Sequence, residues 1–211
     1  KDVPEPHPLP GGYSGKFRTG LQTQSGKIEF IPATLKRFDP DSPDRPPLNR
    51  YIPSWEGPRA EELYRKFPLQ LVTGHARYSY HTVTDSKNSV INDIQDHRVL
   101  IDGYYYWIVR INADDALARG IKMHDLVKVY NDRAAVLCAA DVTEAMAPGV
   151  VHSCESCASY DPVGEPGKLI DRGGCMNLLT PSRKQVAKSD GMAAMSCLVQ
   201  IEKWNEAARA A

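Results

Sequence analysis

The chain has 211 residues, with 26 Lys and Arg against 26 Asp and Glu, so its formal net charge is zero. This balance argues against a nucleic-acid binder, because such proteins need an excess of basic residues to displace counterions. The 42% hydrophobic and 25% charged residues are ordinary globular values and exclude wholesale disorder. No apolar run is long enough to span a bilayer, so we expect no direct membrane insertion.

Proline divides the chain into two regions. Twelve of the 16 prolines lie within residues 1–68, and the proline runs at 4–10 and 39–47 deny the backbone both helical and ladder hydrogen bonds. Between them, residues 26–31 have apolar side chains at alternate positions, which predicts a short strand. We therefore predict an extended arm or linker over 1–66, with one strand at about 23–31 that belongs to a preceding domain.

After residue 67 the sequence is rich in strand signals. Asn112 can cap a short helix that Gly120 ends. Many short strands separated by single-turn helices indicate a small β-barrel rather than a parallel α/β sheet. We therefore predict a mainly β fold with short helices and a barrel domain over 67–211, with strands at 69–73, 104–109, 126–130, 134–142, 150–152 and 197–202.

Cysteine usage indicates reduced thiols. The five cysteines are an odd number in a mid-sized chain, whereas a disulfide framework normally has an even count in a smaller secreted domain. Reduced thiols favour the cytoplasm over the periplasm, although the localisation stays open. Cys154 and Cys157 form a C-x-x-C that could hold zinc with His152 and Cys175, or exchange thiols. No second C-x-x-C and no thioredoxin-like βαβ pattern accompany it, so we expect no metal ligand in this chain.

Two segments have the residue types of a ligand site. Residues 73–82 end a strand with a glycine and then supply two histidines, an arginine and hydroxyls, which suit a phosphate or a polar heterocycle. Residues 172–180 place Gly173 and Gly174 before Asn177, so that the backbone can pass close to a ligand and an amide can pair with a heterocycle. A polar surface loop and a self-satisfied glycine turn remain the alternatives. Neither segment supplies a catalytic pair, and we predict no catalytic residue.

Read together, these segments resemble the C-terminal end of the catalytic subunit of molybdopterin oxidoreductases, the dimethyl sulfoxide reductase family. The matching blocks occur in family order from residue 21 onward. The strand YYYW and the ending DRGGC-x-N-LLTP are most similar to the pyrogallol–phloroglucinol transhydroxylase branch. The blocks themselves are TQSGKIEF at 23–30, GH-x-R-x-x-x-HT at 74–82, INADDA at 111–116, GI at 120–121, DLV at 125–127, NDR at 131–133 and CMNLLT at 175–180.

The resemblance implies a molybdopterin-dinucleotide-binding domain, a six-stranded double-psi β-barrel after the proline-rich arm. Such a domain closes over a bis(pyranopterin guanine dinucleotide) that carries molybdenum or tungsten, while the protein ligand to the metal lies upstream. This chain alone would then be inactive. Its partners would be the remaining domains of the catalytic subunit, with an iron–sulfur electron-transfer subunit as a further candidate. The implied cofactor-binding residues are Thr73, Gly74, His75, Arg77, His81, Thr82, Asn112, Asp115 and Asn177.

The sequence departs from the family pattern at two turns. His124 and Ala134 stand where the family usually has glycine, which indicates altered turns or local strain. The resemblance also leaves open a non-catalytic interaction module, a double-psi barrel that has kept the fold and lost the cofactor.

Overall fold

The structure, a computed structural model, describes residues 21–77, 97–154, 160–186 and 196–204, together with residues 92, 94, 188 and 191. The chain separates into two units, Lys1–Ile52 and Pro53–Ala211. The second unit thus begins before the boundary at residue 67 that the sequence predicts. Within the described residues, no helix is both long and apolar enough to cross a membrane.

The first unit contains one helix, α2 (Ala33–Phe38), and turns among its described residues. Residues 23–31, where the sequence predicts a strand, instead contain a turn closed by hydrogen bonds from the Gly26 amide to the Thr23 carbonyl and from the Leu21 amide to the Gly26 carbonyl. A strand needs a neighbour for its ladder, and no described residue supplies one here. The assignment of this segment to a preceding domain stays a prediction.

The second unit is mainly β, as predicted. Each predicted strand is present within a few residues of its expected bounds. The elements are α3 (Glu61–Lys66), β1 (Leu69–Gly74), β2 (Arg98–Ile101), β3 (Tyr104–Ile111), α4 (Ala113–Leu117), β4 (Leu126–Tyr130), β5 (Ala135–Val142), β6 (Val150–Cys154), β7 (Pro162–Val163), β8 (Ile170–Asp171), the 3₁₀ helix η2 (Met176–Leu178) and β9 (Leu198–Lys203).

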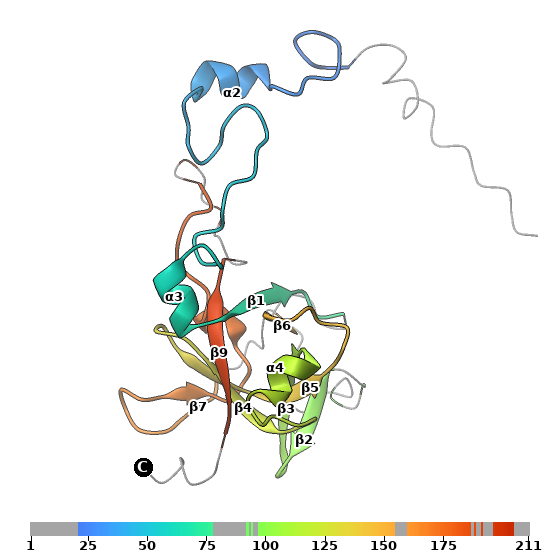
Figure 1. The fold of residues 1–211 in the computed structure, drawn as a ribbon, viewed down its shortest axis with the longest axis vertical. Coiled ribbons are helices and arrows are strands. Elements are labelled where there is room, and N and C mark those ends of the chain that lie inside the picture. Colours follow the sequence, from blue (N-terminus) through green and yellow to red (C-terminus); the bar gives the residue numbers. More distant parts are fainter. Residues whose placement is uncertain are drawn as a thin grey trace, which may run out of the picture. The chain divides into compact units, whose positions relative to one another are not determined.

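Six of these strands close into a barrel (Figure 1). The sheet order is β2-β3-β6-β1-β9-β4-β5-β8-β7, and a further pairing of β3 with β5 joins β3, β6, β1, β9, β4 and β5 in a ring. Within this ring β1–β6 and β3–β5 are parallel, and the other pairs are antiparallel. The closed barrel confirms the predicted fold class, while its double-psi crossover stays a prediction.

Strand direction gives the barrel two distinct ends. The pairings require β1, β4 and β6 to finish at the end where β3, β5 and β9 begin. We call this the loop end, because the segments that follow β1, β4 and β6 leave from it, and because the segment after β8 is hydrogen-bonded to the turn between β4 and β5 there. The other end carries α4 and the start of β6.

The barrel interior is filled by alternate residues of its strands. In β1, Leu69, Leu71 and Thr73 are buried while the residues between them are partly exposed, which is the period-2 pattern of a half-buried strand. The interior cluster also includes Trp107, Val127, Cys138, Val151 and Ile201. The outer face of β3 and β5 carries a second, smaller apolar cluster around Tyr106, Leu137 and Ala139, which explains why β5 is buried on both faces.

His124 occupies a turn that glycine would fit better. Its φ is 63°, in the left-handed region, and its amide donates to the Ala140 carbonyl. Ala134 has no positive φ, so the predicted strain is present at His124 only. This φ lies in the region that glycine adopts without steric cost.

Replacing His124 by glycine is therefore expected to raise the free energy of unfolding by about 0.5 kcal/mol, since relief of the left-handed strain exceeds the added chain entropy. The matched change Ala134→Gly relieves no such strain and is expected to lower it by about 0.5 kcal/mol. Urea unfolding of both variants shows whether each change raises or lowers the free energy of unfolding. Equal effects of the same sign would show that φ at His124 is not the cause.

Candidate cofactor-binding site

The end of β1 brings four of the predicted residues to the loop end. Thr73 is buried and pairs with Ser153 of β6, and Gly74 is the last strand residue, opposite Cys154. His75 and Arg77 follow and are exposed, while Ala76 between them is anchored in the barrel core. The backbone therefore leaves the strand with a small residue at its tip and polar side chains directed to solvent.

The second predicted segment starts from a buried carboxylate that the sequence analysis did not single out. Asp171 is 1% exposed and ends β8. Its Oδ1 accepts from the amides of Asp161 (2.8 Å) and Gly173 (3.0 Å), and its Oδ2 accepts from the amide of Cys175 (2.7 Å). Three amide donors satisfy this buried charge and fix the course of the glycine pair.

Gly174 packs directly against an indole ring. Its φ is +87°, and a Cβ added there would lie 2.1 Å from Cδ1 of Trp107. Trp107 is buried in the core, 4.5 Å from the His97 ring between centroids, and its Nε1–H is a buried donor for which the structure gives no acceptor. The glycine is therefore required both by the backbone conformation and by the close approach to Trp107.

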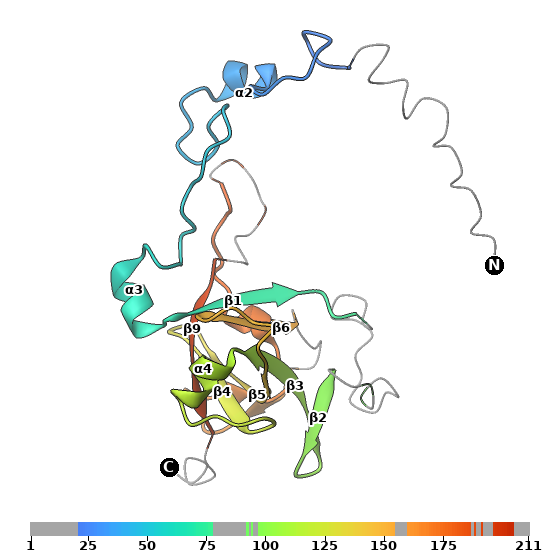
Figure 2. The same ribbon diagram turned by 45° about the vertical axis from the view of Figure 1, so that its right-hand side comes forward.

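Asn177 lies on η2 and is exposed. Its carbonyl accepts from the Thr180 amide (3.3 Å) and from Thr180 Oγ1 (2.9 Å), and no described residue hydrogen-bonds its side-chain amide. Met176 and Ala76 belong to one buried cluster, so both predicted segments are anchored in the same core. In Figures 1 and 2 the orange turn of η2 lies beside β1 and β6.

A group of hydrogen bonds, which we call the Glu56 latch, holds η2 and the start of β9 in place. Arg133 donates through Nη1 and Nη2 to the two Glu56 carboxylate oxygens (2.7 and 3.0 Å) and through Nε to the Leu179 carbonyl (2.8 Å). Asn131 donates to the Leu179 and Leu198 carbonyls (2.8 and 3.2 Å), and the Leu198 amide donates to Glu56 (3.0 Å). The NDR turn therefore has a structural role at the loop end.

Cys197 lies beneath this latch as a buried thiol. Burial raises the pKa of Cys197 to about 11, although nearby Arg133 lowers it. The thiol is therefore protonated at neutral pH, and its Sγ donates to the Leu179 carbonyl at 3.1 Å. This residue acts as a small core side chain, as expected for a cysteine without a reactive role.

Two predicted residues lie at the opposite end of the barrel. Because β3 runs antiparallel to β6, the helix that follows β3 meets the start of β6. Asn112 caps α4 by accepting from the Asp114 amide (2.9 Å) and donates to the Met146 carbonyl (2.8 Å). Asp115 accepts from the Gly149 amide (2.6 Å) and pairs with Arg119 (3.4 Å).

The structure therefore does not bring Asn112 and Asp115 together with the end of β1. Their hydrogen bonds to the segment before β6 explain these residue types without a ligand, and their cofactor contacts stay a prediction. His81, Thr82 and the second half of the C-x-x-C lie outside the described residues. Within the described ranges, no three His, Cys, Asp or Glu side chains lie close enough together to hold a metal ion.

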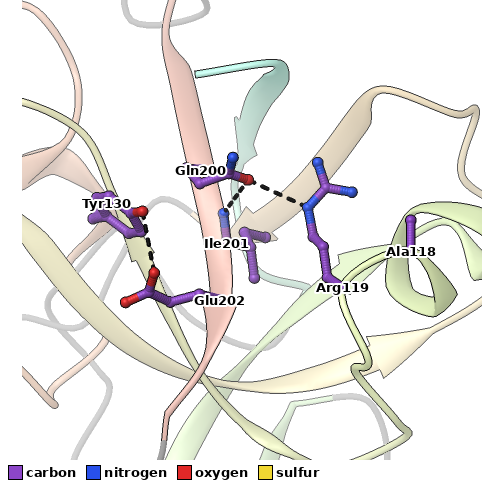
Figure 3. Close-up of a pocket in the computed structure, with 6 residues that line it drawn as sticks. All are labelled: Ala118, Arg119, Tyr130, Gln200, Ile201 and Glu202. Carbon is purple, nitrogen blue, oxygen red and sulfur yellow. Dashed lines mark hydrogen bonds between the residues drawn. The ribbon is translucent and has the colours of Figure 1, made fainter. Parts of the chain in front are cut away.

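A surface depression of about 460 Å³ lies on the side of the barrel, and none of the predicted residues is among those that line it (Figure 3). Arg119 and Gln200 are joined across it at 3.2 Å, and the Tyr130 hydroxyl donates to Glu202 at 3.2 Å. Its polar side chains thus already pair with one another, and the loop end is the better candidate for a ligand site.

Comparisons with known proteins place this barrel in a known family. Residues 69–197 match the family model described as "Molydopterin dinucleotide binding domain". The chain is 52% identical over 191 residues to the pyrogallol hydroxytransferase large subunit of Pelobacter acidigallici, covering 89% of this chain and 22% of that protein. It is 36% identical to the dimethyl sulfoxide reductase of Escherichia coli (87% and 21% covered). It is also 32% identical to the trimethylamine-N-oxide reductase of Haemophilus influenzae (90% and 22% covered).

The class defined by these findings is a dinucleotide-binding β-barrel domain. The chain belongs to the molybdopterin dinucleotide-binding family, as it occurs in enzymes of the dimethyl sulfoxide reductase type. It spans about a fifth of the length of the curated relatives it matches. The acetylene hydratase structure from Pelobacter acetylenicus shares the fold, with a TM-score of 0.62 at 16% identity over 88% of this chain and 24% of that one.

Proposed function

We propose that this chain is the C-terminal lobe that binds the cofactor in a molybdenum or tungsten oxidoreductase and closes over a bis(pyranopterin guanine dinucleotide). The observation that carries the proposal is the loop end, where the tip of β1 and the glycine turn before Asn177 are anchored in one core and the matched family segment, 69–197, spans both.

The donors at the loop end fit such a group. The exposed Arg77 is a cation that can neutralise pyrophosphate charge, and Asn177 presents an amide that can pair with a pterin edge. The buried Nε1–H of Trp107 also has no acceptor among the described residues. Bound there, the metal–dithiolene centre would supply oxo or hydroxyl transfer, while the residues of this chain bind and orient the dinucleotide. The protein ligand to the metal would lie in the rest of the polypeptide.

The experiment is metal and nucleotide analysis of the polypeptide that contains this chain, isolated from its native source. We expect molybdenum or tungsten together with guanine nucleotide, in a polypeptide much longer than 211 residues. A preparation with neither metal nor nucleotide would support the alternative, a non-catalytic barrel that binds a partner, and would overturn the proposal.

Replacing Arg77 by alanine is expected to speed release of guanine nucleotide from that holoenzyme about tenfold, because one charge-assisted hydrogen bond is lost. The matched control is Arg65→Ala, an exposed arginine of α3, which precedes the start of β1 at the opposite barrel end. Equal release rates for both variants would remove Arg77 from the site.

We further propose that the whole polypeptide transfers hydroxyl groups on pyrogallol-like phenols rather than reducing sulfoxides or N-oxides. The support is the identity of 52% with the hydroxytransferase, against 36% and 32% with the two reductases named above. Assaying the holoenzyme with pyrogallol, dimethyl sulfoxide and trimethylamine N-oxide distinguishes hydroxyl transfer on phenols from reduction of sulfoxides or N-oxides. Turnover of only the sulfoxide or the N-oxide would contradict this assignment.

A further inference from the structure

Three side chains form a row across the outer face of the barrel. Asp141 of β5 pairs with Arg110 of β3 (Oδ2 to Nε, 3.1 Å), and Arg110 Nη1 lies 3.3 Å from Nδ1 of His152 on β6. The backbone registers place the three side by side, since Arg110 is opposite both Asp141 and His152. The row therefore links three neighbouring strands and ends at the strand next to β1.

This arrangement fixes the tautomer of His152. A guanidinium can only donate hydrogen bonds, so Nδ1 must accept from Arg110 and the ring proton must reside on Nε2. Burial, followed by the positive charge of Arg110, holds the pKa of His152 below its ordinary value. At neutral pH the imidazole is therefore neutral and offers an Nε2–H donor in the positive field of Arg110.

The Nε2–H faces the tip of β1. A Cβ added at Gly74 would lie 3.4 Å from Nε2, although His152 is opposite Val72 in the register, so the ring leans toward the loop end. No described residue hydrogen-bonds Nε2. Gly74 also has no positive φ, so its backbone conformation does not require glycine. Because Gly74 has no side chain, Nε2 of His152 stays accessible from the loop end.

We propose that His152 binds the dinucleotide by donating its Nε2–H to an oxygen of the pyrophosphate, and that Gly74 keeps this approach open. The inference rests on the proposed function, because it needs a dinucleotide at the loop end. It adds His152, which the sequence analysis weighed only as a zinc ligand, to the cofactor-binding residues. It also gives Arg110 and Asp141 a positioning role, because they hold the imidazole donor in place.

The test uses the holoenzyme that contains this chain, with release of guanine nucleotide as the readout. His152→Phe removes the donor, and release is expected to be about tenfold faster. His152→Gln can place an amide N–H near the same point and is expected to restore slow release. Gly74→Ala covers Nε2 without straining the backbone, so we expect faster release with an unfolding midpoint equal to or above that of the wild type.

A second measurement is independent of the cofactor. The ¹⁵N shifts of the His152 ring in the 211-residue chain are expected to show a protonated Nε2 and an unprotonated Nδ1, with the preference lost in Arg110→Ala. A protonated Nδ1 would overturn the inference, as would unchanged release from His152→Phe and Gly74→Ala. If the wild-type polypeptide contains no guanine nucleotide, the proposed function itself fails, which is a different result.

Discussion

Alanine in place of Gly174 is expected to lower the free energy of unfolding by about 3 kcal/mol or more. The added Cβ would fall 2.1 Å from the Trp107 ring, a distance that no side-chain rotation at an alanine can relieve, and φ at +87° adds left-handed strain. Because Trp107 is buried in the barrel core, either the indole or the whole glycine turn must move. Urea unfolding of the 211-residue chain gives the change directly.

The chain provides a matched control at Gly167. This residue has the same φ of +87°, but nothing lies within 4 Å of an added Cβ. Gly167→Ala should therefore cost only the left-handed strain, about 1 kcal/mol. The difference between the two variants isolates the contact with Trp107. If the free energy of unfolding falls by the same amount in both variants, backbone strain alone explains the glycine at position 174, and the contact with Trp107 does not contribute.

Asp171→Asn is expected to lower the free energy of unfolding by about 3 kcal/mol, because an NH2 group, which donates and cannot accept, replaces one of the two carboxylate oxygens. Whichever way the amide turns, at least one of the three backbone N–H groups of Asp161, Gly173 and Cys175 loses its acceptor in a buried position. The loss should appear locally as faster hydrogen exchange at these amides than in the wild type.

Asp132→Asn makes the same chemical change at an exposed site. Asp132 pairs with Lys66, and both side chains are more than half exposed, so this change should stay within about 0.5 kcal/mol of the wild type. An Asp171→Asn variant as stable as Asp132→Asn, with unchanged exchange at Gly173 and Cys175, would show that the buried carboxylate does not organise the turn.

The strands were the predictable part of this structure, because local patterns specify them. The YYYWIV run of β3 and the LVKVY run of β4 carry aromatic and β-branched residues that favour strands wherever they pack. The same patterns predict a small barrel, and the resemblance implies six strands, but neither predicts the strand order, since no local pattern reveals that β9 pairs with both β1 and β4.

The candidate site was only partly predictable, for two physical reasons. Glu56 lies among prolines and was assigned to the arm, yet its carboxylate bonds the amide of Leu198, 142 residues later. No sequence pattern singles out Asp171, because its role depends on three backbone amides that only the folded glycine turn brings to its carboxylate. Asn112 was predictable in one of its two roles: the sequence predicts that it caps a short helix, and the structure confirms the cap on α4, while the cofactor contact implied by the resemblance stays a prediction.

The position of β9 constrains how a ribosome-bound chain can complete this domain. The strand made last lies between β1 and β4, two strands made much earlier. Until residues 198–203 emerge from the exit tunnel, both of these strands keep an unpaired edge, and the Glu56 carboxylate lacks the Leu198 amide as a donor. The ring therefore closes only once synthesis has passed β9, and such long-range closure is slow compared with forming local hairpins. Until β9 is in place, the barrel of the nascent domain therefore remains open between β1 and β4.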